Sequence, residues 1–517
     1  MGPRNRSNDK EILMFKKSTL AVFLACVTSG TPTYAFEQAL TPTPLPKEAS
    51  SKDRQFIEAL AEAYQNNPDI HVGLREYYAA VEAIPVARAG WLPTITLRGS
   101  GEHQKALSNG KSTAIQPVRR GRSNTATDTL SLQTTVQQNL FKGGQTSYAV
   151  AKAKADVSAA HMKFVGVEQN VLLSAVRAYL DLWKAYEILR YREASVSFRE
   201  RIVAQVKAQE DVGEKTRTDV AEARSQLAAA VAVRLTAESA LVTAQATYAQ
   251  VIGANVPESL KKPAFILPKE QLPKTLEILN ALALKEAPGL QQAIFAEKAQ
   301  RAAVGVSEGT LLPSVDLSAT GSRQKSNTQT NSAFHEGATA KQTGFGYTNT
   351  GTVGVSITVP LYQAGTAWSG VRRANQQRYQ ALNAVKQARL ELLRTARSTL
   401  QSVISLEDSI KQTELQIEAA QLSLEGKRQE YLVGEQTLTD TLIAEQRLVD
   451  AQVQLVERER DYQVAVYQLI SVYGGLLPEQ LGLPVARHNV ALYTDEISTK
   501  LIGTGDLRAP ESIDVKE

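Results

Sequence analysis

Val433-Gly434-Glu435-Gln436-Thr437-Leu438-Thr439-Asp440 decides the fold of this chain, because a matching stretch lies about 220 residues earlier. The earlier copy reads Val212-Gly213-Glu214-Lys215-Thr216-Arg217-Thr218-Asp219. In both copies, a glycine suited to the positive φ of a C-terminal helix cap precedes the Thr-x-x-Asp pattern of a helix start. Each copy therefore predicts a tight turn between two helices.

The same offset relates other parts of the chain, which indicates an internal duplication. An offset of about 220 residues is far longer than the roughly 20–50 residues of solenoid repeats, so the repeated unit has the size of a domain. Four further pairs of segments match: Asn67-Pro68 with Ala287-Pro288, Trp91-Leu92-Pro93 with Leu311-Leu312-Pro313, Leu140-Phe141-Lys142-Gly143-Gly144 with Leu361-Tyr362-Gln363-Ala364-Gly365, and Ile252-Gly253 with Tyr473-Gly474.

Long helices are expected on both sides of each turn. Residues 118–256 and 361–477 contain no proline, and a proline inside a helix costs about 3 kcal/mol or more. Small and apolar residues recur at steps of three and four, which favours coiled-coil packing. Each repeat should hold one helix of about 67 residues, roughly 100 Å long, beside two shorter helices laid end to end. The shorter helices are expected over about 53–90 (with a kink at Pro85), 217–253, 276–309 and 438–473.

Alternating apolar and polar residues predict two β-strands in each repeat. Alternation over about ten residues is typical of membrane-barrel strands, although one such strand alone would equally suit a soluble sandwich. The polar connections, 104–126 and 322–349, are expected to be exposed loops. The strands are expected over about 94–103, 129–140, 315–319 and 352–359.

Four strands are too few to close a barrel, since known membrane barrels start at about eight strands. An open sheet edge is not viable in lipid, so the strands must be pooled between copies of the chain. The residues alone allow a dimer or a trimer. After the N-terminal segment, no apolar run approaches the ~20 residues that a membrane-spanning helix needs.

The N-terminus is predicted to be an export signal that ends at Ala35, with a start at Met1 or Met14. Lys16 and Lys17 precede a short apolar run, and Ala35 is a small residue suited to cleavage. Lipidation at Cys26, the only cysteine, is the alternative. The organisation expected from these features is a signal 1–35, a linker 36–52, a first repeat 53–256, a proline-containing equatorial segment 257–275, a second repeat 276–475 and an equatorial or mobile tail 476–517.

Composition and charge exclude several classes of protein. The net charge of +5 falls to +2 without the signal, which is too balanced for a nucleic-acid partner. The histidines are scattered, and none pairs with cysteine or glutamate at metal-ligand spacing. We therefore expect no enzyme, no cofactor and no metal site.

With its two Val-Gly turns, its duplicated unit and its Leu-Pro before each first strand, the chain resembles the TolC family of outer-membrane efflux and secretion proteins over about residues 53–475. The resemblance implies mostly α-helical protomers whose strands pool into a trimeric twelve-stranded outer-membrane β-barrel, above antiparallel coiled-coil helices that extend into the periplasm of a Gram-negative envelope. The implied partners are two further copies, outer-membrane lipid, a periplasmic membrane-fusion adaptor and an inner-membrane transporter of the RND or ABC type.

The resemblance also assigns roles to residues at the turns. Asp219, Tyr431, Gln436 and Asp440 would form the periplasmic gate, although helix capping alone explains the two aspartates. Gln436 and Ile443 depart from the family pattern, which predicts a looser gate. The adaptor-docking tips would be Val212, Gly213, Glu214, Lys215, Val433, Gly434 and Glu435.

The expected function is that of a channel-tunnel that passively conducts drugs and toxic compounds from an inner-membrane pump. The first alternative is the outer-membrane component of a type I protein secretion system. The second alternative, from another class, is a soluble periplasmic coiled-coil scaffold, which the four alternating strands disfavour.

Overall fold

The computed structural model describes residues 51–500 except 113–118, 258–259, 261, 264–272, 274, 335–338 and 489. The expected signal with Met14 and Cys26, most of the linker, much of the equatorial segment 257–275 and the end of the tail lie outside the described residues. All elements below belong to one compact unit, Thr43–Glu517.

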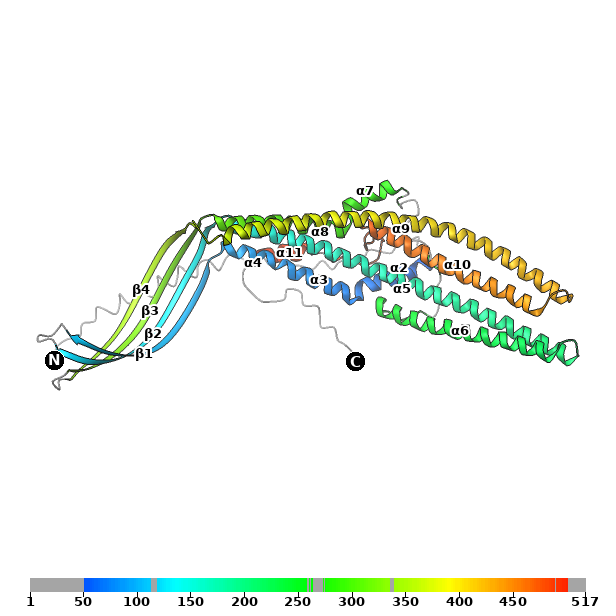
Figure 1. Ribbon diagram of the computed structural model, residues 1–517, viewed down its shortest axis with the longest axis horizontal. Helices are drawn as coiled ribbons and strands as arrows, with labels where there is room; N and C mark the ends of the chain where they lie inside the picture. The colour runs from blue at the N-terminus through cyan, green and yellow to red at the C-terminus, as the bar shows by residue number, and fades with distance from the viewer. Residues whose placement is uncertain are drawn as a thin grey trace. The chain divides into compact units, whose positions relative to one another are not determined.

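The helices and strands occur twice in the expected order (Figure 1). The fold is mostly α-helical with one small antiparallel sheet, as the sequence predicts. The first repeat contains α2 (Ser51–Asn66), α3 (Pro68–Val81), α4 (Ala83–Arg88), β1 (Thr94–Ser112), β2 (Arg119–Lys142), α5 (Gln145–Asp211) and α6 (Arg217–Ile252). The second contains α7 (Leu276–Glu286), α8 (Pro288–Glu308), β3 (Ser314–Phe334), β4 (Thr339–Thr358), α9 (Thr366–Leu432) and α10 (Leu438–Val472), and α11 (Val490–Thr499) follows.

The two long helices, α5 and α9, have the expected 67 residues each. Helix α5 contacts α3 and α6, and α9 contacts α8 and α10. Each long helix thus packs along shorter helices of its own repeat, as predicted, and α5 also packs against α8 and α10 of the second repeat. The sheet and the two helical turns lie at opposite ends of the long helices (Figure 1).

Prolines divide the shorter helices more finely than expected. The sequence predicts continuous helices over 53–90 and 276–309, but these are interrupted at Asn67 and at Ala287. Pro68 and Pro288 begin the next helices, because a proline lacks the N–H that a helix interior needs and suits the first turn. The expected kink at Pro85 is present as a break between α3 and α4 at Glu82.

The sheet has the order β1-β2-β3-β4, all antiparallel. Its strands have 19, 24, 21 and 20 residues, so the expectation that 104–126 and 322–349 are loops was wrong for the residues of these segments that the structure describes. These segments have a loop-like composition, but their residues continue the strand ladders up to Ser112↔Arg119 and Ala333↔Thr339. Threonine hydroxyls pair between these segments, as in Thr125 and Thr330 at 3.3 Å.

The pairing register gives the sheet two chemically distinct faces, because successive side chains of a strand point to opposite sides. The polar face carries mainly Ser, Thr and Gln, such as Ser131 opposite Ser100. On the apolar face, the aliphatic side chains lie mainly in the rows near the helices: Ile95, Leu97, Leu130, Leu132, Val136, Val315, Leu317, Ala319, Val353, Val355 and Ile357. The alternation of apolar and polar residues expected from the sequence is thereby confirmed.

The core lies where α2, α5 and α10 meet, around Tyr64, Leu172, Tyr179 and Tyr467. The C-terminal segment belongs to it as well. Leu481, Leu483 and Val485 are buried, so this part of the segment expected to be an equatorial or mobile tail packs into the core.

Helix α6 contradicts the expectation that no run is long and apolar enough to span a membrane. It holds a window of mean hydropathy 1.5, of which 11% is buried. The alanines of this window account for the value. The window also includes Arg234 and Glu238, which form an i,i+4 ion pair. Because α6 lies along α5, length and composition are weak evidence for a span here.

Candidate functional site

The turns that join α5 to α6 and α9 to α10 have the same backbone geometry. Gly213 and Gly434 have φ values of 80° and 85°, as the sequence predicts for left-handed caps. The N–H of Glu214 donates to the carbonyl of Gln209 at 2.9 Å, and the N–H of Glu435 donates to the carbonyl of Glu430 at 2.9 Å. These are Schellman bonds, which satisfy carbonyls that a helix end leaves free.

Both following helices begin with a complete capping box, so the capping interpretation of the two aspartates is confirmed. Asp219 Oδ2 accepts from the N–H and the hydroxyl of Thr216, each at 2.8 Å. Asp440 Oδ2 accepts from the N–H of Thr437 at 3.2 Å and from its hydroxyl. Bonds from the backbone and side chain of these threonines hold the pKa of each carboxyl below its usual range, so both aspartates stay charged in mild acid.

The ends of the turns present apolar side chains to solvent. Val212 is 72% exposed, Val433 is 73% exposed and Leu432 is 60% exposed. Valine and leucine are usually buried, and exposed apolar groups rimmed by charges mark interaction sites. Glu214 and Glu435 lie beside them and are exposed too. The turns therefore have the character of a docking surface.

Tyr431 links the two turns within one chain. Its hydroxyl donates to Gln209 Oε1 at 3.4 Å, and the Lys215 ammonium lies 5.4 Å from its ring centre. Within the protomer the Tyr431 hydroxyl does not bond to Asp219, whose Oδ2 accepts from Thr216. Burial, and then the charge of Asp219, raise the pKa of Tyr431, so it remains a neutral donor.

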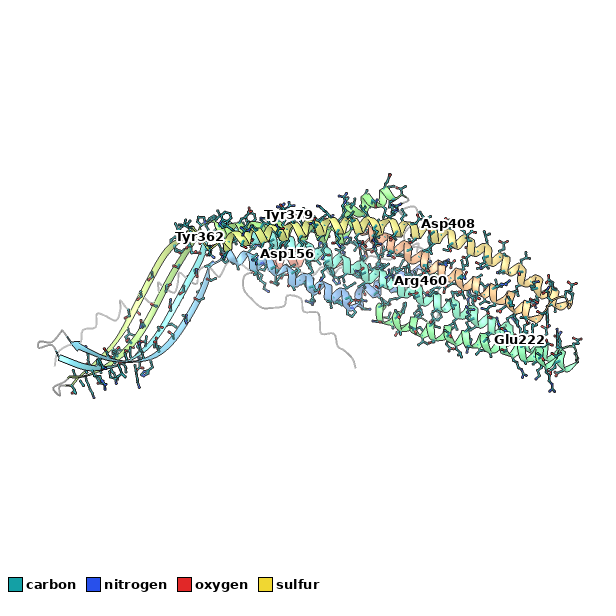
Figure 2. The ribbon with its side chains drawn as sticks, viewed as in Figure 1. Asp156, Glu222, Tyr362, Tyr379, Asp408 and Arg460 are labelled. Atoms are coloured by element: carbon teal, nitrogen blue, oxygen red, sulfur yellow. The ribbon has the colours of Figure 1, made fainter. Side chains whose placement is uncertain are left out.

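Two further candidate residues, one in the second turn and one near the start of α10, lie at this same end of the helices. Gln436 is half-buried, and Ile443, one turn beyond Asp440, is 45% exposed. Figure 2 shows Glu222 near the turn end of α6. The structure therefore gathers the expected gate and tip residues at one end of the molecule.

Sequence reasoning missed a buried polar network a few helical turns away from the turns. Arg199 of α5 and Glu445 of α10 are each 4% exposed and pair at 2.9 Å. Arg199 also donates to the side chains of Gln226 on α6 and Gln446 on α10, at 3.3 and 2.8 Å. The sequence did carry a signal for this network, because charged residues occur at positions where the predicted coiled coil packs its helices together.

A second ion pair extends this link between the repeats. Arg192 Nη1 lies 3.1 Å from Asp450 Oδ1, and Gln446 donates to the same oxygen at 2.9 Å. The network therefore ties the first repeat's long helix to the second repeat's short helix close to the tips.

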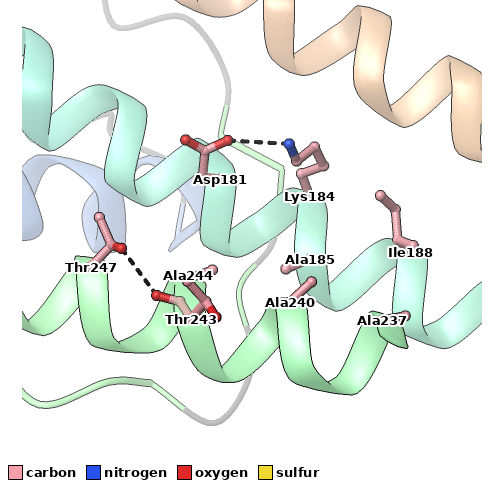
Figure 3. A pocket seen from close by; sticks show the side chains of 9 residues that line it. All are labelled: Asp181, Lys184, Ala185, Ile188, Ala237, Ala240, Thr243, Ala244 and Thr247. Carbon is pink, nitrogen blue, oxygen red and sulfur yellow. Dashed lines mark hydrogen bonds and ion pairs between the residues drawn. The ribbon is translucent and has the colours of Figure 1, made fainter. Parts of the chain in front are cut away.

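The groove between α5 and α6 is a packing feature. Figure 3 shows Ala185 of α5 facing Ala237, Ala240 and Ala244 of α6, around a space of about 340 Å³. The charged groups at its rim, Lys184 and Asp181, pair with each other at 3.4 Å. Among the described residues, no cluster of three or more His, Cys, Asp or Glu side chains is placed to hold a metal ion.

The duplicated helical scaffold with its amphipathic four-stranded sheet defines a class of envelope protein, and comparison with known proteins identifies the family. The family model for outer membrane efflux proteins matches residues 59–254 and 279–475. The chain belongs to the outer membrane efflux protein family, which places it in the outer membrane as an export channel.

Named relatives cover nearly the whole chain. The outer membrane efflux protein BepC of Brucella suis is 31% identical over 88% of this chain and 92% of its own length. The outer membrane protein TolC of Escherichia coli is 26% identical over 86% and 89%. The crystal structure of the CmeC outer membrane channel of Campylobacter jejuni superposes with a TM-score of 0.68, at 16% identity, over 92% of this chain and 97% of its own.

Proposed function

We propose that this chain is one protomer of a homotrimeric channel-tunnel in a tripartite export system, which passively conducts toxic compounds and drugs out of the cell. The sheet carries the proposal. Its apolar face is exposed, with Val353 at 76% and Leu97 at 69%. Among the described strands, β1 and β4 each pair with a single neighbour, and such edges are not viable in lipid. Three copies supply twelve strands, enough to close a barrel.

Aromatic side chains support a membrane position for the sheet. Trp91, Tyr362 and Trp368 are exposed where the strands meet the helices, and Figure 2 shows Tyr362 at this junction. Phe345 and Tyr347 are exposed further along β4. Aromatic girdles of this kind flank the apolar band of outer-membrane barrels. The polar Ser, Thr and Gln face would then line a water-filled lumen.

The two turns would dock a periplasmic adaptor that connects the channel to an inner-membrane pump. Their exposed valines, flanked by Glu214, Lys215 and Glu435, support this role. Beside them, Asp219, Tyr431, Gln436 and Asp440 would form a gate, in which Tyr431 restrains the first turn through Gln209 and Lys215. The export role rests on the family description and on the name of BepC as an efflux protein, and toxic compounds and drugs as its cargo are part of the proposal.

Purification of the mature chain tests the proposal. In detergent, light scattering should give the mass of a trimer, and planar bilayers should show discrete conductance steps. A stable detergent monomer with its full strand content would overturn it, because the open sheet edges would then be unexplained. Absence from the outer-membrane fraction would instead favour the soluble scaffold.

A further inference from the structure

The apolar face of the sheet changes character along the strands. From the row in which Arg323 stands opposite Leu132 outward, cationic side chains occur on this same face: Lys105, Arg122, Arg323, Lys325 and Lys341. We call these five residues the basic band. Among the described residues of this face, Asp128 is the one acidic side chain, and it is already bonded to His103. The band therefore presents a strong excess of positive charge.

Aromatic rings lie within the basic band, with Tyr347 opposite Lys325 and Phe345 in the next row outward. The Lys325 ammonium lies 5.2 Å from the Phe345 ring centre, and the Arg323 guanidinium lies 5.3 Å from that of Tyr347. The two rings meet edge to face at 5.1 Å. Aromatic rings mark the level where hydrocarbon gives way to headgroups, and long basic side chains reach toward that level. Arg323 and Lys325 are thus held at headgroup depth.

A hollow lies at the same level. It has a volume of about 470 Å³ and is lined by Gly101, His103, Asp128, Leu130, Lys325 and Phe345, among others. Gly101 opens it, since this residue has no side chain, and a Cβ there would meet only Leu130, at 3.9 Å. The walls of the hollow carry a cation, an aromatic ring and the hydrogen-bonded pair of His103 and Asp128, all from the apolar face of the sheet.

We propose that this hollow and the basic band bind a phosphate group of a phosphorylated glycolipid in the outer leaflet, a site that rests on the barrel orientation proposed above. Arg323 and Lys325 pair with the phosphate oxygens. Phe345 and Leu130 contact the first methylenes of the acyl chains. Surface charge complementarity selects a phosphorylated lipid over a neutral one.

The opposite face supplies a matched control. Arg98 is exposed on the polar face, where it pairs in register with Gln133. It has the same charge as Arg323 but would point into the lumen. Removing it changes the total charge without touching the basic band.

Native mass spectrometry of the detergent trimer tests the site, with a bisphosphorylated glycolipid, its dephosphorylated form and inorganic phosphate as probes. The wild type should bind the phosphorylated lipid more tightly than the dephosphorylated one by roughly tenfold or more. Arg323→Gln combined with Lys325→Gln should lose that preference, and Arg98→Gln should keep it.

Equal lipid binding by the double variant and the wild type would overturn the site. Equal binding of the dephosphorylated lipid would overturn phosphate recognition, and displacement of the lipid by millimolar inorganic phosphate would make it a free-anion site. Mass and bilayer conductance are measured on the same preparations. A conducting trimer without lipid discrimination overturns this inference alone, whereas loss of trimer and conductance in the wild type overturns the proposed function.

Discussion

Arg199 and Glu445, 246 positions apart in the sequence, form a buried ion pair with 2.9 Å between Nη2 and Oε2. Arg199 belongs to the long helix of the first repeat and Glu445 to the short helix of the second. The pair therefore joins the two repeats of one chain near the proposed gate. Arg199 Nε and Glu445 Oε1 are buried without a hydrogen-bond partner, so the pair contributes specificity more than stability.

Breaking this pair should be costly because it leaves a buried charge unpaired. We expect Glu445→Gln to lower the free energy of unfolding by about 3–5 kcal/mol, and Arg199→Met with Glu445→Leu to recover most of that loss. Chemical denaturation followed by the helical circular dichroism signal measures both. The control is Arg234→Gln, whose more exposed pair with Glu238 spans 3.7 Å and should be worth at most about 1 kcal/mol. Equal losses in Glu445→Gln and the control would show that the pair has no special role.

Tyr64 should make the protein sensitive to alkali. Its hydroxyl donates to Glu168 Oε1 at 2.6 Å, and Glu168 also pairs with Arg487 at 2.8 Å. Burial, followed by the charge of Glu168, raises the pKa of Tyr64 far above its usual value of 10.0. The folded state thus favours the neutral hydroxyl. This contribution is complete below about pH 10 and declines as the pH rises further.

Replacing Tyr64 separates the contribution of its hydrogen bond from the effect of ionising its hydroxyl. Tyr64→Phe should cost about 1.5–3 kcal/mol at neutral pH, since the lost bond is to a charged group. Above pH 10 the variant should lose stability less steeply than the wild type. Tyr379→Phe, at a side chain that is 55% exposed, should match the wild type in both measurements. Parallel pH profiles for Tyr64→Phe and the wild type would argue against this assignment.

The turn glycines should matter for export and not for assembly. Gly213→Pro or Gly434→Pro should abolish efflux, because proline cannot adopt the positive φ seen at both positions. The trimer should remain in the membrane, since the turns lie at the opposite end from the sheet. Gly289→Ala, in open space within α8, serves as a control. Drug accumulation and adaptor cross-linking measure the effect, and normal efflux by both proline variants would remove the docking role.

Asp440→Asn tests the charge of the gate apart from its cap. Asparagine keeps an oxygen that can accept from Thr437, so stability should change little. Three copies of Asp440 near the axis would favour cations, so the variant should be less cation-selective in reversal-potential measurements. Because hydrogen bonds lower the pKa of this carboxyl, the wild type should keep its selectivity until the pH falls below the usual aspartate range. Asp219→Asn is the matched variant at the other turn, and an unchanged potential in Asp440→Asn would place its carboxylate away from the pore.

The sequence by itself determined the features that depend on neighbouring residues. The turns follow from Gly213 and Gly434 with their Thr-x-x-Asp boxes, because caps are made within a few residues. The 67-residue helices follow from tracts without proline, and the two faces of the sheet follow from alternation. Duplication reinforced each inference, since every local signal occurs twice.

Only the tertiary structure decided which distant groups meet. Ser, Thr and Asn in 104–126 and 322–349 resemble loop residues until a partner strand completes their ladder. Tyr431 donates to Gln209 and not to Asp219, and Arg199 finds Glu445, because helix packing sets the distances between these side chains. Such pairings depend on three-dimensional proximity across hundreds of residues, for which local propensity carries no information.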